Sequence, residues 1–372
     1  MERSKVRRRR LAGGILAGLA IGAFALGSAL GDDSEPPPPS VASTLPLPQL
    51  AGERTIAGLE GTAITSRLRA AIRRGRLAGV VLFADSFPSR AAGKRLIASL
   101  QRIRRPAALR DPLLIMIDQE GGKVKRVDGP PVASAAEMGR RGAAFSREQG
   151  RLTAANLRRI GVNVYLAPVL DIARPGGDIA ETERGFGSTP KRVAATAVPF
   201  AEGLREGGVA AVAKHFPGIG TARDNTDSSV QHLRLSTGSL RAVDVAPYRA
   251  FVAAGGELVM LSTAIYPALA PDPAAFARPI ATAELRGRLG FEGVSVTDAL
   301  DTVAVENFGG PAEASVAAAR AGTDLLLFTD LAAAEAGAAA LVAKLRAGRL
   351  LRAEFEASAQ RVLDLRERLA GA

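Results

Sequence analysis

Short, continuous apolar runs alternate with amphipathic stretches along this chain from about residue 52 onward. Strands covered by helices on both faces read as unbroken apolar runs, so this pattern is typical of a parallel sheet. Eight runs predict strands at Thr55–Leu59, Val80–Ala84, Leu113–Asp118, Val162–Ala167, Val209–Lys214, Leu258–Ser262, Val294–Asp298 and Asp324–Thr329. Eight strands over about 275 residues predict a (β/α)₈ TIM barrel. A doubly wound open sheet is the alternative.

The stretches between these runs have the apolar spacing of helices. They predict helices at Ile64–Arg74, Arg90–Ile103, Arg147–Ile160, Lys191–Glu206, Ala242–Ala254 and Ala314–Ala321. Two closing helices are expected from Ala332 onward, the last over Ala353–Leu369. No glycine-rich dinucleotide fingerprint follows the first strand, which favours the barrel over the open sheet. We therefore predict one catalytic domain over residues 51–372, with α/β architecture.

The first 50 residues have a different character. Residues 1–10 hold six basic groups, and an uncharged apolar run follows from Leu11 to Gly31. This order is typical of an export signal, and the run is also long enough to span a bilayer. We predict a signal peptide or membrane anchor over residues 1–31 and a Pro-rich linker over 32–50. The catalytic part is thus expected to be exported, either extracytoplasmic or membrane-anchored.

Composition excludes several classes of site. The chain has no cysteine, which excludes disulfides, thiolate catalysis and Cys-ligated zinc. Only two histidines are present, which argues against a multi-His metal centre. Of the net charge of +12, residues 1–10 supply +5 and the other +7 is spread over 362 residues. With aromatic residues at 4% and no recognisable binding module, we predict no nucleic-acid partner.

Polar residues follow several predicted strands, at the barrel end where catalytic groups are mounted. Asp118 and Arg126 can converge on one ligand and bind vicinal sugar hydroxyls, or they can form a structural salt bridge. Asp298 ends the seventh run, where a carboxylate is available as a nucleophile toward an anomeric carbon. The alternative for Asp298 is a helix N-cap before Ala299.

The fifth apolar run ends in Lys214 and His215, followed by a Pro/Gly turn. A buried lysine needs an anionic or hydroxyl-rich partner, because an unpaired buried charge is costly. His215, by composition alone, reads as a satisfied core histidine. Asp171, after the fourth run, can hold neighbouring cationic side chains in place, and Arg184 lies in a glycine-bearing loop whose signal is weak by itself.

Taken in order, these motifs resemble the bacterial β-N-acetylhexosaminidases of glycoside hydrolase family 3. The matching stretches are Asp118-Gln119-Glu120-Gly121-Gly122 with Arg126, Pro130-Pro131, Ala167-Pro168-Val169-Leu170-Asp171, Arg184 before Phe186-Gly187, Lys214-His215-Phe216-Pro217-Gly218, and Thr297-Asp298-Ala299-Leu300. The resemblance implies a single barrel domain with Asp298 as the nucleophile of a covalent glycosyl-enzyme. It implies that the terminal sugar is held by Asp118, Arg126, Arg184, Lys214 and His215. It implies no metal ion and no organic cofactor.

The chain departs from the family in the loop after Gly220. The N-acetylhexosaminidase branch carries an Asp-Ser-His element there, whose His acts as general acid/base. This chain has Asn225-Thr226-Asp227 instead, so Asp227 stands at the His position. Three readings stay open: Asp227 is the acid/base, provided that its pKa is raised; His232 or Asp224 takes that role; or the protein binds sugar without efficient turnover.

The expected function is a retaining exo-glycosidase that acts on terminal β-linked sugars. N-acetylglucosamine from cell-wall muropeptides or chitin-like oligosaccharides is the expected substrate class, and we expect a monomer. A non-catalytic envelope sugar-binding protein and a β-glucosidase-type exo-glycosidase are the alternatives.

Overall fold

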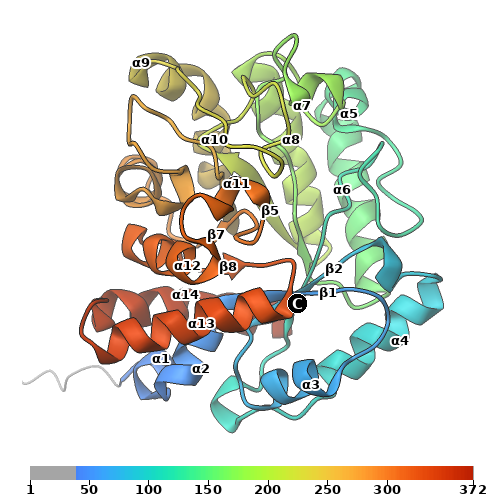
Figure 1. Cartoon of the computed structure of the whole chain (residues 1–372). Coiled ribbons are helices and arrows are strands. Elements are labelled where there is room, and N and C mark those ends of the chain that lie inside the picture. The colour runs from blue at the N-terminus through green and yellow to red at the C-terminus, as the bar shows by residue number, and fades with distance from the viewer. Residues whose placement is uncertain (1–38, 372) are drawn as a thin grey trace, which may run out of the picture. The chain divides into compact units, whose positions relative to one another are not determined.

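The computed structural model describes residues 39–371, which contain one eight-stranded parallel barrel (Figure 1). Its strands are β1 Thr55–Leu59, β2 Gly79–Leu82, β3 Leu114–Ile117, β4 Val164–Tyr165, β5 Ala210–Phe216, β6 Leu258–Leu261, β7 Val294–Thr297 and β8 Leu326–Leu327. Each strand pairs in parallel with the next along the chain from β1 to β7, and β8 pairs with β1. A parallel bridge between Val296 and Leu325 closes the ring between β7 and β8. The predicted barrel is confirmed, and the open sheet is wrong.

Helices follow the strands and cover the outside of the barrel (Figure 1). The main ones are α3 Ser66–Arg73, α4 Arg90–Gln101, α5 Ala135–Arg141, α6 Ala143–Arg158, α8 Pro190–Glu206, α10 Ala246–Ala253, α12 Gly310–Ala321, α13 Leu331–Arg346 and α14 Arg352–Ala370. The helix predicted at Ala242–Ala254 is divided: a π-helical turn at Leu240–Asp244 precedes α10, whose first turn contains Pro247. Pro is tolerated in a first turn because a backbone N–H there has no acceptor within the helix, so Pro247 is compatible with the start of a new helix. A helical stretch at Pro279–Arg288 was not predicted.

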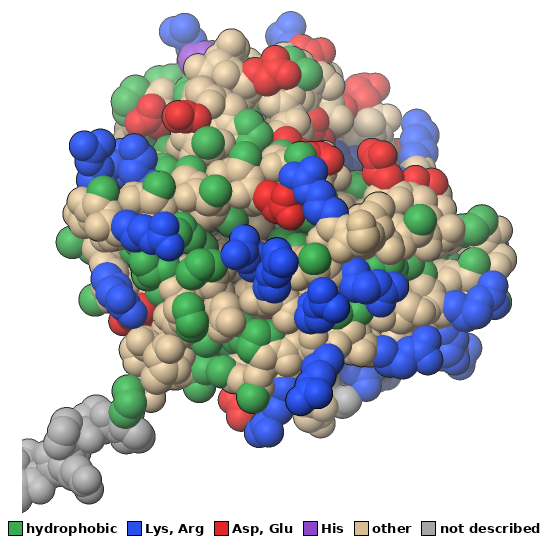
Figure 2. All heavy atoms as spheres, turned by 60° about the horizontal axis from the view of Figure 1, so that its bottom comes forward, with side chains coloured by type: hydrophobic (Ala, Val, Ile, Leu, Met, Phe, Trp, Pro, Cys, Tyr) green, Lys and Arg blue, Asp and Glu red, His purple; other side chains and the backbone are tan. Residues whose placement is uncertain are grey.

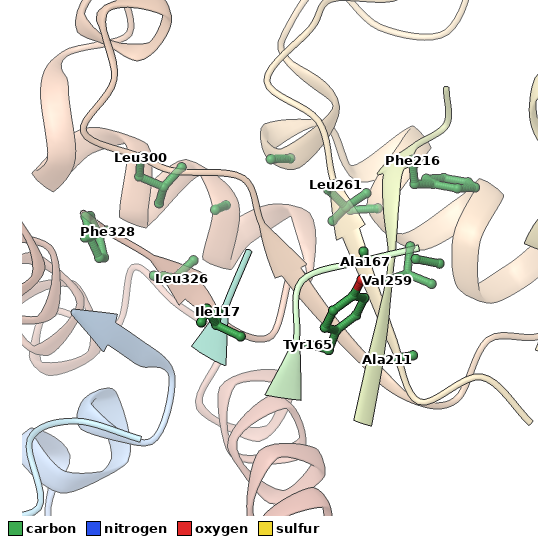
Figure 3. Packing of buried hydrophobic residues seen from close by; sticks show 14 of the residues in the cluster. Ile117, Tyr165, Ala167, Ala211, Phe216, Val259, Leu261, Leu300, Leu326 and Phe328 are labelled. Carbon is green, nitrogen blue, oxygen red and sulfur yellow. The ribbon is translucent and has the colours of Figure 1, made fainter. Parts of the chain in front are cut away.

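Side chains alternate along the strands between two apolar layers. Ile56, Val81, Leu114 and Met116 belong to the layer inside the barrel. The residues between them along the strands, such as Ile117, pack outward against the helices. Figure 3 shows part of this outer layer, with Tyr165, Ala167, Ala211, Phe216, Val259, Leu261, Leu326 and Phe328 on neighbouring strands and strand ends. The interior of the barrel formed by residues 39–371 is therefore a filled core, which leaves an end of the strands as the place for a ligand.

Part of the predicted linker is folded. Val41–Thr44 and Leu47–Gly52 form the short helices α1 and α2, which pack against α14 and α13 (Figure 1). Ala42 and Leu50 are fully buried, and the backbone N–H of Ala42 donates to Oε1 of Gln360. The apolar residues of this Pro-containing stretch thus belong to the barrel's outer layer, so the folded domain begins about ten residues before the predicted boundary at residue 51.

The segment predicted as signal peptide or anchor, residues 1–31, lies outside the described residues. Between residues 39 and 371, no helix combines the length and the apolar character needed to cross a membrane.

Candidate functional site

A cavity of about 260 Å³ opens at the C-terminal ends of the strands. Its apolar floor consists of inward-facing core residues, among them Val81, Leu166, Met260 and Leu327. All seven residues predicted for the site line this cavity: Asp118, Arg126, Arg184, Lys214, His215, Asp227 and Asp298. They come from five different strand-to-helix connections or strand ends, so the barrel brings together residues as far apart in sequence as 118 and 298.

Charged side chains on one wall form a continuous network. The Nζ atom of Lys214 lies 2.7 Å from Oδ1 of Asp118 and 2.8 Å from Oε1 of Glu120. The guanidinium of Arg184 donates to both carboxylate oxygens of Glu120, from Nε and Nη2 at 2.8 Å each. This two-point contact fixes the plane of the guanidinium as well as its position. The partner that the sequence required for Lys214 is therefore a pair of carboxylates.

Glu120 is the centre of this network, although no separate role was predicted for it from the sequence. Burial disfavours its charge, but Lys214 and Arg184 outweigh that effect and hold its pKa well below the usual range. The same carboxylate, together with Asp118, outweighs the burial of Lys214 and raises the pKa of that lysine. Both cations therefore stay charged and in place before a substrate arrives. The sequence signal that could have identified Glu120 was a second carboxylate, two residues after Asp118 at a strand end, when the buried Lys214 at another strand end needed an anionic partner.

Arg126 reaches the cavity because the loop before it is fixed internally. The side-chain oxygen of Gln119 accepts hydrogen bonds from the backbone N–H groups of Arg126, at 2.7 Å, and Val127, at 3.0 Å. The hydroxyl of Tyr165 on β4 donates to the backbone carbonyl of Gln119. Gln119 is fully buried, so these bonds determine where the loop leaves β3.

His215 is held by Asp171, a buried carboxylate after β4. The distance from Nδ1 of His215 to Oδ2 of Asp171 is 2.7 Å, and the other carboxylate oxygen accepts from the backbone N–H of Ile219. The contact leaves the far side of the imidazole ring for the cavity that His215 lines. The interpretation of His215 as a core histidine is thus incomplete, because its ring is both satisfied by Asp171 and part of the cavity wall.

Asp298 directly follows β7 and is half-buried at the cavity wall. Its backbone N–H donates to the carbonyl of Leu261 on β6, and its Oδ1 accepts from the backbone N–H of Ala299 at 2.9 Å. No helix begins at Ala299; the next one, α11 Val303–Glu306, has Thr302 at its N-cap. The N-cap interpretation of Asp298 is wrong, and its other carboxylate oxygen accepts no hydrogen bond from residues 39–371.

Asp227 approaches Asp298 from the loop after β5. The loop is closed by a turn in which Oδ1 of Asn225 accepts from the backbone N–H of Asp227 at 2.8 Å. The backbone carbonyl of Asp227 accepts from Ala304, which ties the loop to the connection after Asp298. Asp227 is exposed as a residue, but its carboxyl group lines the cavity. The negative charge of Asp298, and secondly desolvation of the carboxyl group, raise the pKa of Asp227 to about 7. Two carboxyl groups therefore share the cavity, and one of them holds its proton near neutral pH.

The two other candidates for the acid/base lie elsewhere. His232 and Asp224 are solvent-exposed, and neither lines the cavity. His232 instead forms a backbone bridge with Ile265. Of the three residues considered, only Asp227 is placed to exchange a proton with a ligand in this cavity.

The cavity offers hydrogen-bonding and charged groups for a polar ligand, with Phe83 and Thr329 completing the wall. Its volume is slightly below the ~300–1,000 Å³ typical of small-molecule sites. Within residues 39–371, no cluster of three or more His, Asp or Glu side chains is arranged to hold a metal ion. The arrangement suits one polar ring seated on an apolar floor, with two carboxyl groups beside it.

Known proteins match this chain over most of its length. Residues 48–365 match the glycosyl hydrolase family 3 N-terminal domain. A protein of Arthroderma benhamiae named an uncharacterized secreted glycosyl hydrolase is 35% identical over 329 residues, which cover 86% of this chain and 93% of that protein. A beta-hexosaminidase of Stenotrophomonas maltophilia is 36% identical over 281 residues, which cover 73% of this chain and 81% of the relative.

Solved structures agree with these matches. A beta-N-acetylhexosaminidase from Beutenbergia cavernae superposes with a TM-score of 0.80 at 32% identity, over 87% of this chain and 99% of that one. A family 3 beta-N-acetylglucosaminidase from Paenibacillus sp. superposes with a TM-score of 0.83 at 32% identity, over 88% of this chain. The match spans 64% of the Paenibacillus protein, which is therefore considerably longer.

Proposed function

Because the chain belongs to glycosyl hydrolase family 3, we propose that it is a retaining exo-glycosidase that removes terminal β-linked N-acetylglucosamine from cell-wall or chitin-like oligosaccharides. The chain is a glycoside hydrolase of the beta-hexosaminidase type, acting on O-glycosyl compounds. The substrate, the covalent step and the residue roles below are the proposal. The observation that carries it is the pair Asp227 and Asp298 in one small cavity, where the charge of Asp298 raises the pKa of Asp227.

Asp298 is proposed as the nucleophile. It ends β7 at the mouth of the barrel, and one of its oxygens is held by Ala299 while the other is available to a sugar. Attack on the anomeric carbon forms a covalent glycosyl-enzyme and inverts that centre once. Water then attacks the same carbon, which inverts it again and yields net retention.

Asp227 is proposed as the acid/base. Its raised pKa of about 7 keeps a substantial fraction of Asp227 protonated up to neutral pH, so that it can donate to the departing glycosidic oxygen. Once Asp298 has become an ester, its negative charge is gone and the pKa of Asp227 falls. Asp227 can then accept the proton of the attacking water. The repulsion between the two carboxylates thus raises the pKa of Asp227 before the glycosyl-enzyme forms, and the loss of this repulsion lowers that pKa afterwards.

The charged wall is proposed to bind the hydroxyl groups of the sugar. Asp118 offers carboxylate acceptors, while Lys214 and Arg184 offer donors in positions fixed by Glu120. Arg126 and His215 are proposed to complete the set, since both line the same cavity. A cavity of about 260 Å³ suits one terminal ring rather than the interior of a long chain, which supports exo-action.

Export of the catalytic domain is part of the proposal. It is supported by the basic and apolar sequence of residues 1–31 and by the relative named as a secreted glycosyl hydrolase. An extracytoplasmic site would meet oligosaccharide or muropeptide substrates where they arise.

The test is hydrolysis of aryl β-glycosides by the full chain and by two matched variants. We expect release from the aryl β-N-acetylglucosaminide, with the β-anomer of the sugar formed first, as followed by NMR. Asp298→Ala should lower kcat by roughly 10³-fold or more, because a nucleophile has no substitute. Asp224→Asn, a change of an exposed carboxylate in the loop of Asp227, should leave the rate unchanged.

Three outcomes would contradict the proposal. Preferred release from the aryl β-glucoside would favour a β-glucosidase, and sugar binding without product would favour a binding protein. Initial formation of the α-anomer would contradict retention.

A further inference from the structure

The net positive charge of the folded chain is concentrated in one region. Residues 60–111 contain 12 Lys and Arg but only 3 Asp and Glu, whereas the rest of residues 39–371 is close to neutral. The charge outside the first ten residues is therefore not spread evenly, contrary to the expectation from composition. Figure 2 shows Lys and Arg side chains spread over the lower part of that view, with few acidic side chains among them.

Six exposed arginines form the part of this region that we call the basic face: Arg73, Arg74, Arg76, Arg102, Arg104 and Arg110. They lie at the last residue of α3 and in the connections that lead from α3 into β2 and from α4 into β3. The two connections pack together, because a Cβ added at Gly75 would lie 2.6 Å from Cδ1 of Leu109. The basic face is thus one continuous surface, at the barrel edge opposite the cavity.

Carboxylates do not neutralise this surface. None of the six arginines forms an ion pair with a carboxylate of residues 39–371. Arg67, on the same helix as Arg73, is by contrast paired with Glu335. Two of the three acidic residues of the segment, Glu60 and Asp85, follow the C-terminal ends of β1 and β2, at the cavity edge. Exposed guanidinium groups without a carboxylate partner can bind external anions, and they match phosphate geometry well.

The end of α2 lies beside the basic face. A Cβ added at Gly52, the last residue of α2, would lie 2.5 Å from the carbonyl oxygen of Gly75. Eight residues separate Gly31, the end of the apolar run, from Ser40, the N-cap of α1. Such a segment reaches at most about 30 Å. If residues 11–31 hold the chain in a membrane, the folded domain is therefore tethered within about this distance of the lipid headgroups.

We propose that the basic face docks on an anionic phospholipid surface and turns the cavity away from the bilayer. The inference rests on the membrane-anchor alternative for residues 1–31 and on export of the domain, and not on the glycosidase activity. Each arginine near an anionic bilayer contributes about 1 kcal/mol, which is about a fivefold change in the ratio of docked to undocked protein. The docked domain would present its sugar site to substrate on the side remote from the membrane.

The experiment places one fluorophore at two alternative positions of the full chain. The chain has no cysteine, so Ala108→Cys and Ser188→Cys each create a single labelling site. Ala108 is exposed on the basic face, and Ser188 is exposed in the connection from β4 to α8, at the cavity edge. Contact is read as quenching by a spin-labelled lipid, in vesicles of phosphatidylcholine alone or with phosphatidylglycerol.

We expect the label at residue 108 to be quenched only in vesicles that contain phosphatidylglycerol, and the label at residue 188 in neither. Replacing three arginines of the basic face by glutamine (Arg73→Gln, Arg76→Gln and Arg104→Gln) should lower the ratio of docked to undocked protein by about 100-fold. The matched control changes three exposed arginines elsewhere (Arg234→Gln, Arg249→Gln and Arg320→Gln) and should leave docking unchanged. Both triple variants should keep full activity on aryl glycosides.

Equal losses of docking in the two triple variants would overturn the proposal, because net charge alone would then be responsible for docking. Quenching at residue 188 would also overturn it, because another face would then contact the bilayer. Stronger binding to polyphosphate than to vesicles at equal phosphate concentration would also overturn it, since the partner would not be lipid. Flotation with vesicles of phosphatidylcholine alone reports the N-terminal attachment separately, so its failure is distinguishable from failure of the basic face.

Discussion

At the scale of single residues, the site depends on carboxyl groups whose surroundings separate their roles. Glu120 lies between two cations and stays ionised, whereas Asp227 faces Asp298 and holds a proton to about pH 7. In glycosidases, surroundings that push the pKa values of two carboxyl groups apart decide which group acts as the acid and which stays ionised. The sequence predicted Asp227 and Asp298 as a pair. The direction and cause of the pKa shift of Asp227 became evident only from their placement in one cavity.

The raised pKa of Asp227 predicts how activity depends on pH. A general acid must be protonated, so kcat/KM for a substrate with a poor leaving group should fall as pH rises through about 7. In Asp227→Asn this fall should disappear together with most of the activity, while Asp224→Asn should keep the wild-type profile. Rates measured from pH 5 to 9 check this, and an unchanged alkaline limb in Asp227→Asn would contradict the role of Asp227.

The position of Glu120 predicts a large loss of stability on removal of its charge. Glu120→Gln leaves Lys214 and Arg184 buried without their shared counter-charge, so we expect a loss of about 3–5 kcal/mol in the free energy of unfolding. Because the pKa of Glu120 is depressed, its contribution is present above about pH 4 and is lost only in strong acid. Urea unfolding at pH 7 measures the change.

A matched control for Glu120→Gln is Glu335→Gln, which removes the exposed partner of Arg67. Exposed ion pairs contribute at most about 1 kcal/mol, so this variant should unfold nearly as the parent does. Equal losses in the two variants would mean that Glu120 is not the centre of a buried network.

At the scale of elements, the sequence predicted every strand but not how many residues of each strand pair with its neighbours. The apolar run at Val162–Ala167 gave only the short strand β4 Val164–Tyr165. The side chain of Asn163 explains the difference, because its Oδ1 accepts from the backbone N–H of Ile115 at 2.7 Å and replaces a ladder bond. A pattern of apolar residues carries no information about such substitutions, nor about the π-helical turn before α10.

The closure of the barrel between β1 and β8 predicts a steric effect. A Cβ added at Gly58 would lie 1.8 Å from the carbonyl oxygen of Thr329, which also lines the cavity. Gly58→Ala should therefore destabilise the fold by about 1–3 kcal/mol. Gly238→Ala, where nothing lies within 4 Å, should be neutral or slightly stabilising. Thermal unfolding checks both, and an unaffected Tm in Gly58→Ala would contradict the tight closure.

At the scale of the whole molecule, the barrel accounts for what could and could not be predicted. Residues at strand ends converge by topology, so Asp118, Lys214 and Asp298 were predictable as one site once eight strands were counted. The folded helices α1 and α2 were not, because a Pro-containing segment reads as a linker until its apolar residues are seen packed against α13 and α14. The basic face was missed for a similar reason, since two separate connections form one surface only in three dimensions.

The most direct test of the central claim is covalent trapping of the enzyme by a 5-fluoro glycosyl fluoride of N-acetylglucosamine, followed by mass spectrometry of its peptides. The account predicts one adduct, on Asp298, which forms in the wild type and turns over more slowly in Asp227→Asn. An adduct on another residue, or slow release of sugar without any adduct, would contradict it.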